Sequence, residues 1–241
     1  MISRSQKKLE KASKEVKTMN DKIQVEILEF NFNRSYELDQ YKLIYDKIES
    51  LKDVSVLINN VGYTIGSRNV INYHLMQDDE ILSYFNINLI PAIHLTKFCL
   101  SQMIANRNDK KSAVITLSSI ISLMPSSSGA HMYSGAKVFL NNFMTSLSDT
   151  PIYKNIDFLT LKTASVKTNM NRGTLPLSVT ADDYAEGAIR HLGYEKEDSG
   201  HWKHALTTHV VFNPIFLPYI AYNMSKHKQS LGLNNSQKPV D

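Results

Sequence analysis

A chain of 241 residues with 42% hydrophobic and 21% charged residues has globular proportions and is long enough for one large hydrophobic core. Its formal net charge of +4 is too small a bias to favour nucleic-acid binding, and the basic residues near its start alternate with acidic ones. A single cysteine, Cys99, excludes an internal disulfide and favours a reducing compartment.

Short apolar runs alternate with longer stretches of helical period along the chain. The apolar runs predict strands at residues 23–30, 54–60, 112–119, 156–163 and 204–212. The stretches of helical period predict helices at residues 5–19, 36–51, 78–107, 131–148 and 181–192. Strands that alternate with helices predict an α/β fold with a doubly wound parallel sheet, covered on both faces.

The last part of the chain differs in composition from the rest. We expect one domain over residues 1–225 and a polar tail over residues 226–241. No segment has the roughly 18 to 20 uninterrupted apolar residues that a membrane-spanning helix needs. The apolar stretch at residues 210–224 is interrupted by Asn213, Pro214 and Pro218, so it could cover the core, a partner or a bilayer surface.

Polar residues follow the predicted strands at the points where a cleft should open. "NNVG" follows the strand at residues 54–60, and "SSIIS" and "TASVKTNM" follow the next two strands along the chain. Ligands of open parallel sheets bind outside the carboxyl ends of the strands. These three segments are therefore the first places to look for a site.

Tyr133 and Lys137 lie in "HMYSGAKVF" at positions i and i+4 of a predicted helix, so their polar groups share one face. A nearby ammonium favours the ionised phenol and lowers its pKa, which makes tyrosine a usable proton donor to a carbonyl oxygen. The spacing alone is weak evidence, because it occurs by chance in many helices.

Three more polar positions strengthen the argument. Ser119 ends a predicted strand fourteen residues before Tyr133, and strand alternation points either Ser119 or its neighbour Ser118 away from it. Asn88 lies within a predicted helix, where asparagine is a mediocre helix former, so we expect it to form a hydrogen bond inside the protein. Asn86 is the alternative, about 200° away around the helix.

The motifs together resemble the short-chain dehydrogenase/reductase family. They are "LINNVG" at residues 57–62, "NINL" at 86–89, "LSS" at 117–119 and "YSGAK" at 133–137, in the order of the family and near its spacings. "ISRSQKKLEK" at the start and "NPIFLPYIAYNMSK" near the end are most similar to the branch of 17β-hydroxysteroid dehydrogenases and very-long-chain 3-oxoacyl-CoA reductases. The resemblance extends over residues 1–225 and implies a Rossmann-like fold.

By this resemblance, four residues carry the reduction of a ketone. Tyr133 donates the proton to the substrate carbonyl, and Ser119 forms a hydrogen bond with the same oxygen. Lys137 holds the nicotinamide ribose and lowers the pKa of the phenol. Asn88 anchors a water molecule that links Lys137 to solvent.

The same resemblance implies NADPH as the cofactor. Ser3 and Arg4 would contact its 2′-phosphate, for which a guanidinium has suitable planar donors. Thr168 would bind the nicotinamide amide, and Asn31 would lie near the adenine, where the family usually has an aspartate. Asn59, Asn60 and Gly62 would support the central sheet and the adenosine side.

The sequence departs from the family at its start. The first strand and the glycine-rich turn of the family should precede "ISRS", and no G-x-x-x-G-x-G run occurs anywhere in the chain. That turn normally brings backbone N–H groups to the pyrophosphate. We therefore expect a sheet that lacks this central strand, in a chain that is N-terminally truncated relative to the family. Thr163, in place of a proline, and Pro91, in place of a small residue, are smaller departures.

The resemblance also implies substrates, partners and location. The substrate would be a 3-oxoacyl-CoA of fatty-acid elongation, which we favour, or a 17-ketosteroid. The helices at residues 88–107 and 133–149 would pair in a homodimer. Relatives of this branch are held in the endoplasmic reticulum membrane by an apolar segment, which is not found here, so we expect a soluble or peripheral chain with residues 210–224 as its membrane contact. The alternative is a non-catalytic family member that binds a partner.

Overall fold

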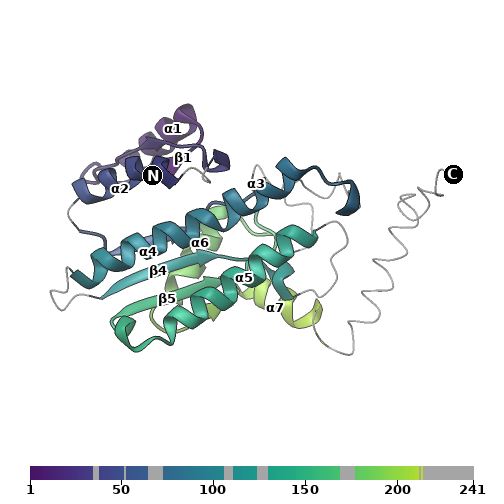
Figure 1. Cartoon of the computed structure of the whole chain (residues 1–241). Helices are drawn as coiled ribbons and strands as arrows, with labels where there is room; N and C mark the ends of the chain where they lie inside the picture. Colours follow the sequence, from purple (N-terminus) through teal and green to yellow (C-terminus); the bar gives the residue numbers. More distant parts are fainter. Residues whose placement is uncertain are drawn as a thin grey trace.

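The computed structural model describes residues 1–34, 38–51, 53–64, 73–105, 111–123, 130–168, 177–211 and 213 (Figure 1). The α-helices within these ranges are α1 (Gln6–Met19), α2 (Tyr41–Ser50), α3 (Asp78–Asn88), α4 (Ile90–Ala105), α5 (His131–Ser148), α6 (Ala181–Arg190) and α7 (Trp202–Val211). The strands are β1 (Ile2–Ser3), β2 (Leu28–Glu29), β3 (Val56–Asn59), β4 (Ser112–Leu117), β5 (Ile156–Leu161) and β6 (Glu197–Asp198).

All of these strands pair in parallel, as predicted, but they form two sheets. One sheet has the order β3-β4-β5-β6, and the other contains β1 and β2. Among the described residues, neither β1 nor β3 has a strand on its other side. The sheet is thus divided between β1 and β3, where the resemblance to the family predicts a missing strand.

Helices cover both faces of the four-stranded sheet. Figure 1 shows α4 and α5 in front of β4 and β5, and α6 behind them. Side chains alternate accordingly along β4, because successive residues of a strand point to opposite faces. Val114 packs with residues of α4 and α5, whereas Ile115 packs with Tyr184 and Ala188 of α6. This is the layered, Rossmann-like arrangement that the sequence predicts.

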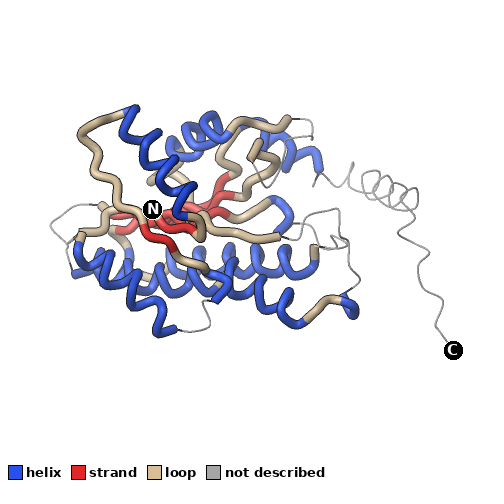
Figure 2. Tube along the Cα trace, turned by 90° about the horizontal axis from the view of Figure 1, so that it is seen from above, coloured by secondary structure: helices blue, strands red, loops and turns tan. Residues whose placement is uncertain are grey.

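The N-terminal layer consists of β1, β2, α1 and α2, and it packs on the rest of the protein through an aromatic cluster. Phe30 meets Phe32 edge to face and lies beside Tyr41, and this group packs against Leu95 of α4. Seen from above, helices lie on both sides of the strands (Figure 2). The contact between the layer and the larger sheet is therefore mainly apolar.

The predicted strand at residues 204–212 is wrong, because this segment belongs to helix α7. His204 and Ala205 both donate backbone hydrogen bonds to the carbonyl of His201, which starts the helix. The histidine, threonine and valine residues favour a strand on propensity alone. Burial of His204 at 0% exposure, with the buried Thr208 hydroxyl four residues later, gives the segment the period of a helix.

Other boundaries differ in smaller ways. The predicted helix at residues 78–107 is two helices that meet at Leu89, because Pro91 has no N–H to donate within the first turn of α4. The strand predicted at 23–30 is reduced to β2, and β6, with its two acidic residues, has no apolar run that could predict it. Helix α2 begins at Tyr41, and part of the predicted segment before it lies outside the described residues.

Two predictions concern regions that the structure describes little or not at all. Of the apolar stretch 210–224 only residues 210, 211 and 213 are described, and the tail 226–241 lies outside the described residues. None of the helices in the described part of the chain combines the length and the apolar character that a membrane crossing requires. The bounds of the domain and of its tail stay predictions.

Candidate active site

Tyr133 and Lys137 lie one turn apart near the start of α5. Lys137 is only 3% exposed, and its ammonium donates a hydrogen bond to the carbonyl of Leu117, the last residue of β4, at 2.7 Å. The same nitrogen lies 5.5 Å from the centroid of the Tyr133 ring. Burial lowers the pKa of Lys137 to about 8, so the side chain stays mostly charged at neutral pH.

The end of β4 brings a serine to Tyr133. The two serines after Leu117 point in different directions: the Ser118 hydroxyl donates to the backbone carbonyl of Lys137 at 3.2 Å, and Ser119 forms a side-chain hydrogen bond with Tyr133. Ser119 also accepts a hydrogen bond from the N–H of Ile121 at 3.3 Å. Ser119, rather than Ser118, is therefore the serine that reaches the phenol.

The expected lowering of the Tyr133 pKa by Lys137 is wrong for this structure. Burial raises the pKa of the phenol and outweighs the hydrogen bond from Ser119, which lowers it, while the nearby Tyr84 also raises it. The ammonium of Lys137 is directed to the Leu117 carbonyl. In this state Tyr133 is a neutral phenol, which is the protonation state that a proton donor needs.

Asn88 is 1% exposed and fixes the segment that follows β3. Its side-chain oxygen accepts from the N–H of Tyr63 at 3.0 Å, and its amide nitrogen donates to the carbonyls of Tyr63 and Tyr84, both at 3.1 Å. Asn86 instead donates to the carbonyl of Asn33 at 3.0 Å. The two asparagines thus serve different regions, and Asn88 is the one beside the site.

Gly62 lies next to the polar side-chain atoms of both Asn88 and Lys137. A Cβ atom at this glycine would lie 3.6 Å from the Asn88 side-chain oxygen and 3.8 Å from the Lys137 ammonium. Gly62 is not among the glycines of the described residues with positive φ, which are Gly193 and Gly200. Both distances from this Cβ atom are ordinary van der Waals distances, so the Gly62 backbone lies beside the polar centre in a space that would also admit a small side chain.

Asn59 and Asn60, at the end of β3, behave differently from each other. The amide of Asn59 donates to the hydroxyls of Thr96 at 3.0 Å and Thr116 at 3.2 Å, which ties β3 to α4 and β4. Asn60 is exposed and donates through its backbone N–H to Ile58. A cavity of about 30 Å³ beside them is large enough for a water molecule, and it is lined by Asn59, Asn60, Asn88, Leu95 and Leu140 among others.

The residues predicted to bind the far end of the cofactor lie in the N-terminal layer. Ser3 ends β1 and Arg4 follows it. Burial raises the pKa of Tyr63, and the charge of Arg4 acts in the opposite direction. Asn31 is exposed after β2, where its side chain accepts a hydrogen bond from the N–H of Asn33 at 3.1 Å.

The segment after β5 is held by two residues that the sequence did not suggest. Thr163 shares a hydrogen bond of 2.6 Å with the hydroxyl of Tyr184. His204 accepts from the N–H of Ala164 at 3.3 Å through one ring nitrogen, and its other ring nitrogen lies 3.1 Å from the Ser165 carbonyl. These bonds need a neutral imidazole, and burial lowers the pKa of His204 accordingly.

Thr168 is exposed at the end of this segment, and the residues after it, 169–176, lie outside the described ranges. The predicted residues therefore gather at the carboxyl ends of the parallel strands, where such sheets bind their ligands. Tyr133, Lys137, Ser119, Asn88 and Gly62 form one connected centre. Of the other predicted residues, Ser3 ends β1, Arg4 and Asn31 follow β1 and β2, and Thr168 lies in the segment after β5.

A match to a family model identifies the family of this chain. The model for short chain dehydrogenases matches residues 1–176, which is most of the chain. The protein belongs to the short-chain dehydrogenase family. The match to this family thus places it among oxidoreductases, as the motifs predicted.

Similar sequences have names from the predicted branch. A hydroxysteroid dehydrogenase-like protein 1 of Gallus gallus is 27% identical over 214 residues, which cover 86% of this chain and 61% of that protein. A very-long-chain 3-oxoacyl-CoA reductase of Aspergillus niger is 27% identical over 218 residues, covering 86% and 60%. An inactive hydroxysteroid dehydrogenase-like protein 1 of Homo sapiens is 26% identical over 215 residues, covering 86% and 61%. The chain spans about three fifths of the length of these three relatives.

Solved structures support the fold of this short-chain dehydrogenase. A bulky-bulky ketone specific alcohol dehydrogenase from Comamonas testosteroni superposes with a TM-score of 0.68 at 14% identity, covering 100% of this chain and 86% of that one. A short chain dehydrogenase from Burkholderia cenocepacia in complex with NADP gives a TM-score of 0.60 at 13% identity, covering 87% and 77%. At such identities the likeness concerns the fold.

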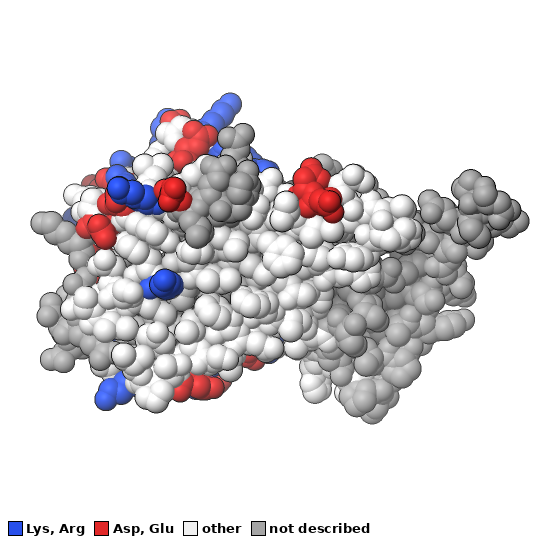
Figure 3. Space-filling model, in the orientation of Figure 1, with Lys and Arg blue, Asp and Glu red and all other residues white. Residues whose placement is uncertain are grey.

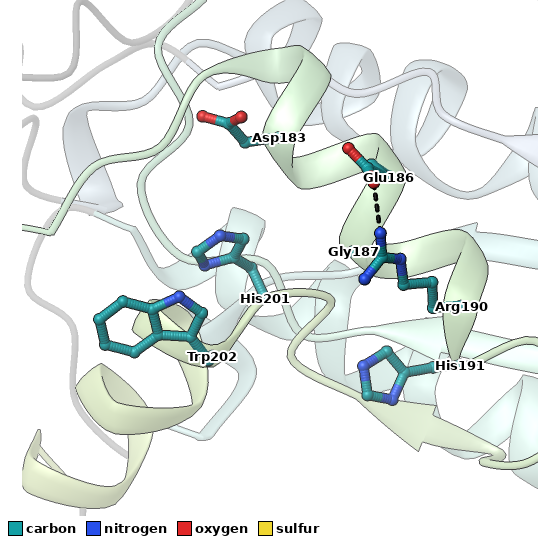
Figure 4. A pocket seen from close by; sticks show the side chains of 7 residues that line it. All are labelled: Asp183, Glu186, Gly187, Arg190, His191, His201 and Trp202. Carbon is teal, nitrogen blue, oxygen red and sulfur yellow. Dashed lines mark hydrogen bonds and ion pairs between the residues drawn. The ribbon is translucent and has the colours of Figure 1, made fainter.

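A separate hollow of about 340 Å³ lies between α6 and the start of α7 (Figure 4). At this hollow Arg190 forms an ion pair with Glu186, and a ring nitrogen of His191 lies 3.7 Å from a carboxylate oxygen of Asp198. None of the predicted site residues lines this hollow. We therefore assign the active site of this family member to the strand ends and not to this surface.

Proposed function

We propose that this short-chain dehydrogenase reduces a ketone to an alcohol with NADPH, and that Tyr133 is the proton donor. The observation that carries the proposal is the group of the half-buried Tyr133 and Ser119 with the buried Lys137 at the carboxyl end of β4, with the Gly62 backbone beside the Lys137 ammonium. A neutral phenol next to a hydroxyl and an ammonium is suited to giving up a proton to a developing alkoxide.

Each of the four proposed catalytic residues has a separate role in the reaction. The phenol of Tyr133 donates its proton to the ketone oxygen, and the hydroxyl of Ser119 forms a hydrogen bond with that oxygen and with the phenol. The ammonium of Lys137 stabilises the phenolate that remains. Asn88 holds the backbone of Tyr63 beside this centre, and the neighbouring cavity has room for the water that we assign to Asn88.

The residues present fit a nicotinamide cofactor at both of its ends. NADPH would supply the hydride, with Lys137 and Thr168 at the nicotinamide end and Ser3 and Arg4 at the 2′-phosphate. The open backbone at Gly62 leaves room next to Lys137, and the Arg4 charge acts on nearby Tyr63. Between the ends, the sequence has no glycine-rich turn to receive the pyrophosphate.

For the substrate we propose a 3-oxoacyl-CoA of fatty-acid elongation, with a 17-ketosteroid as the other option. The support is the name of the Aspergillus niger relative for the first and of the dehydrogenase-like relatives for the second. We also propose association with the endoplasmic reticulum membrane through residues 210–224, a prediction that rests on resemblance to this branch.

A homodimer through residues 88–107 and 133–149 is part of the proposal. Charged side chains gather over α1 and α2, whereas few lie over α4 and α5 on the same face of the molecule (Figure 3). On α5, Val138 and Phe139 are 38% and 41% exposed, and Phe139 stacks on Phe143. An apolar helical face of this kind favours pairing with a second copy.

A non-catalytic role, in which the chain binds a partner, is the second candidate. The division of the sheet between β1 and β3 favours it, because the two cofactor ends would be held by separate sheets. One similar human protein also has "inactive" in its name. Binding of NADPH distinguishes the two candidates.

The test begins with fluorescence titration of the purified chain with NADPH, followed by turnover of a 3-oxoacyl-CoA and a 17-ketosteroid. We expect saturable binding and reduction. Tyr133→Phe should lower turnover by a factor of about 10²–10⁴ and leave the NADPH dissociation constant within about twofold. The matched control is Tyr194→Phe, a tyrosine that is 87% exposed, which should change neither quantity. Absence of NADPH binding would contradict the catalytic proposal, and full turnover in Tyr133→Phe would exclude Tyr133 as the acid.

A further inference from the structure

Asn141 lies two turns after Tyr133 on α5, on the same face as Tyr133 and Lys137. It is 7% exposed, and its amide nitrogen donates to the hydroxyl of Ser122 at 2.8 Å. The Ser122 hydroxyl in turn donates to the carbonyl of Ser119 at 2.6 Å. A continuous chain of hydrogen bonds therefore runs from the middle of α5 to the residue that contacts the phenol.

We propose that Asn141 is a positioning residue that holds Ser119 against Tyr133 through the hydroxyl of Ser122. This inference rests on the proposed function, because it concerns the proton donor of that reaction. Asn141 and Ser122 lie outside the family motifs, so the sequence alone does not suggest this role for them.

The turn that carries Ser119 explains why such support is needed. Residues Ile120–Leu123 form one 3₁₀ turn after β4, in which the backbone N–H of Ser122 donates to the Ser119 carbonyl at 3.1 Å, and a turn this short has few further bonds of its own. Its inner side is fixed by Asn141 through Ser122, and a second bond from the hydroxyl of Ser134 reaches the carbonyl of Ile121 at 3.0 Å. Both supports come from α5, the helix that also carries Tyr133.

The environment of Asn141 favours this role over a purely structural one. Its side-chain oxygen is buried and has no hydrogen-bond partner in the described part of the chain. A buried carbonyl without a partner lowers stability, and a leucine of similar size would fill the space without that cost. The hydrogen bond from the Asn141 amide nitrogen to the Ser122 hydroxyl is therefore the reason for an asparagine at this position.

Release of the turn has a defined consequence for Tyr133. The hydrogen bond with Ser119 lowers the pKa of the phenol, against the effect of burial. Without the Ser122 hydroxyl, the Ser119 carbonyl would keep only the bond from the Ser122 backbone N–H. We expect the Ser119 hydroxyl then to be held less firmly against Tyr133, so that the phenol pKa rises further. Proton transfer would then weaken, while the residues proposed to hold the cofactor would be untouched.

The experiment compares Asn141→Leu, Ser122→Ala, their double variant and the control Asn142→Leu, which changes an exposed neighbour on the same helix. The phenol pKa of Tyr133 is measured by alkaline absorbance, as the difference between each variant and the same variant with Tyr133→Phe. Turnover and the KM for NADPH are measured alongside. Because the absorbance measurement needs no substrate, it decides this inference even if the wild-type chain has no turnover, a result that would count only against the proposed function.

We expect Asn141→Leu and Ser122→Ala each to raise the phenol pKa by at least about half a unit and to lower kcat roughly tenfold, with the KM for NADPH within about twofold. The double variant should be no worse than either single one, since both changes break one chain of bonds. Ser122→Thr, which keeps the hydroxyl, should recover the loss. An unchanged phenol pKa, additive losses, or an equal effect of Asn142→Leu would overturn the inference. If Asn141→Leu does not fold, the comparison of Ser122→Ala with Ser122→Thr decides it.

Discussion

Two regions of the molecule hold the proposed site in different ways. The catalytic corner, which consists of the end of β4, the turn Ile120–Leu123 and the first half of α5, is partly buried around the buried Lys137, and its polar groups are joined by hydrogen bonds. The N-terminal layer, which consists of β1, β2, α1 and α2, has a charged surface and its own small sheet, and it contacts the rest mainly through apolar side chains. The groups proposed to transfer the proton are therefore preorganised within one region, while the proposed recognition of the cofactor phosphate depends on how the second region is held.

This difference predicts that substitutions in the two regions change different kinetic quantities. A change in the catalytic corner should affect kcat, because it alters groups that act on the reacting atoms. A change in the N-terminal layer should affect cofactor affinity. A change at the border between the two sheets should have little effect on either kcat or cofactor affinity.

Beyond Tyr133→Phe, the largest effect is expected for Lys137→Met. Turnover should fall by a factor on the order of 10²–10³, because the ammonium next to the phenol is lost. Stability should rise at neutral pH, since a buried charge is removed. In the wild type, the folded-state pKa of about 8 lies below the ordinary value of 10.5, so the unfolded state binds more protons between these values and stability increases with pH in that window.

Urea unfolding at neutral pH and about pH 9.5 measures this effect. The wild type should gain roughly 1–2 kcal/mol over that range, and the gain should disappear in Lys137→Met. Lys154→Met, on an exposed position, is the control and should keep both the turnover and the pH dependence. Retention of the pH-dependent gain in Lys137→Met would show that another group causes it.

A smaller effect is expected for Arg4→Ser in the N-terminal layer. The guanidinium is proposed to pair with the 2′-phosphate, so the KM for NADPH should rise roughly tenfold while the KM for NADH stays unchanged. Lys8→Ser, which removes an exposed charge from α1, controls for the general loss of positive charge. Equal changes for both cofactors would argue against contact with the 2′-phosphate.

The smallest effect is expected for Ile58→Thr on β3. Ile58 is 57% exposed beside the open edge of β3, whereas its register partner Ile115 on β4 is 5% exposed. Ile58→Thr should change the free energy of unfolding by less than about 0.5 kcal/mol, and Ile115→Thr should lower it by roughly 2–3 kcal/mol. Thermal or urea unfolding provides the measurement. Equal losses at the two positions would mean that Ile58 is covered in solution.

The sequence was a good guide where one pattern dominated locally. Helix α5 has the predicted bounds, because its apolar residues follow one period for 18 residues, and the motif positions of Tyr133 and Lys137 follow from it. The parallel strands β3, β4 and β5 were predicted from short apolar runs. The carboxyl ends of these strands then gave the location of the candidate site.

The rest depended on contacts between distant residues. The segment of α7 has strand propensity, and only its packing against Ala164 and Ser165 through His204 makes it a helix with a buried face. The support of Ser119 by Asn141 joins residues 22 positions apart through a third side chain, and no local pattern contains that information. The pKa of Tyr133 was predicted in the wrong direction because its burial could not be known from spacing.

The bonds between β4 and α5 have a consequence for evolution of the intervening loop. The Ser118 hydroxyl holds the Lys137 backbone, the Lys137 ammonium holds the Leu117 carbonyl, and Ser134 holds Ile121. These bonds join the end of β4 and the turn Ile120–Leu123 directly to α5, and so fix the spacing of the phenol, the hydroxyl and the ammonium. The number of residues between Leu123 and Ala130 can therefore change among relatives while the groups proposed to react keep their separation.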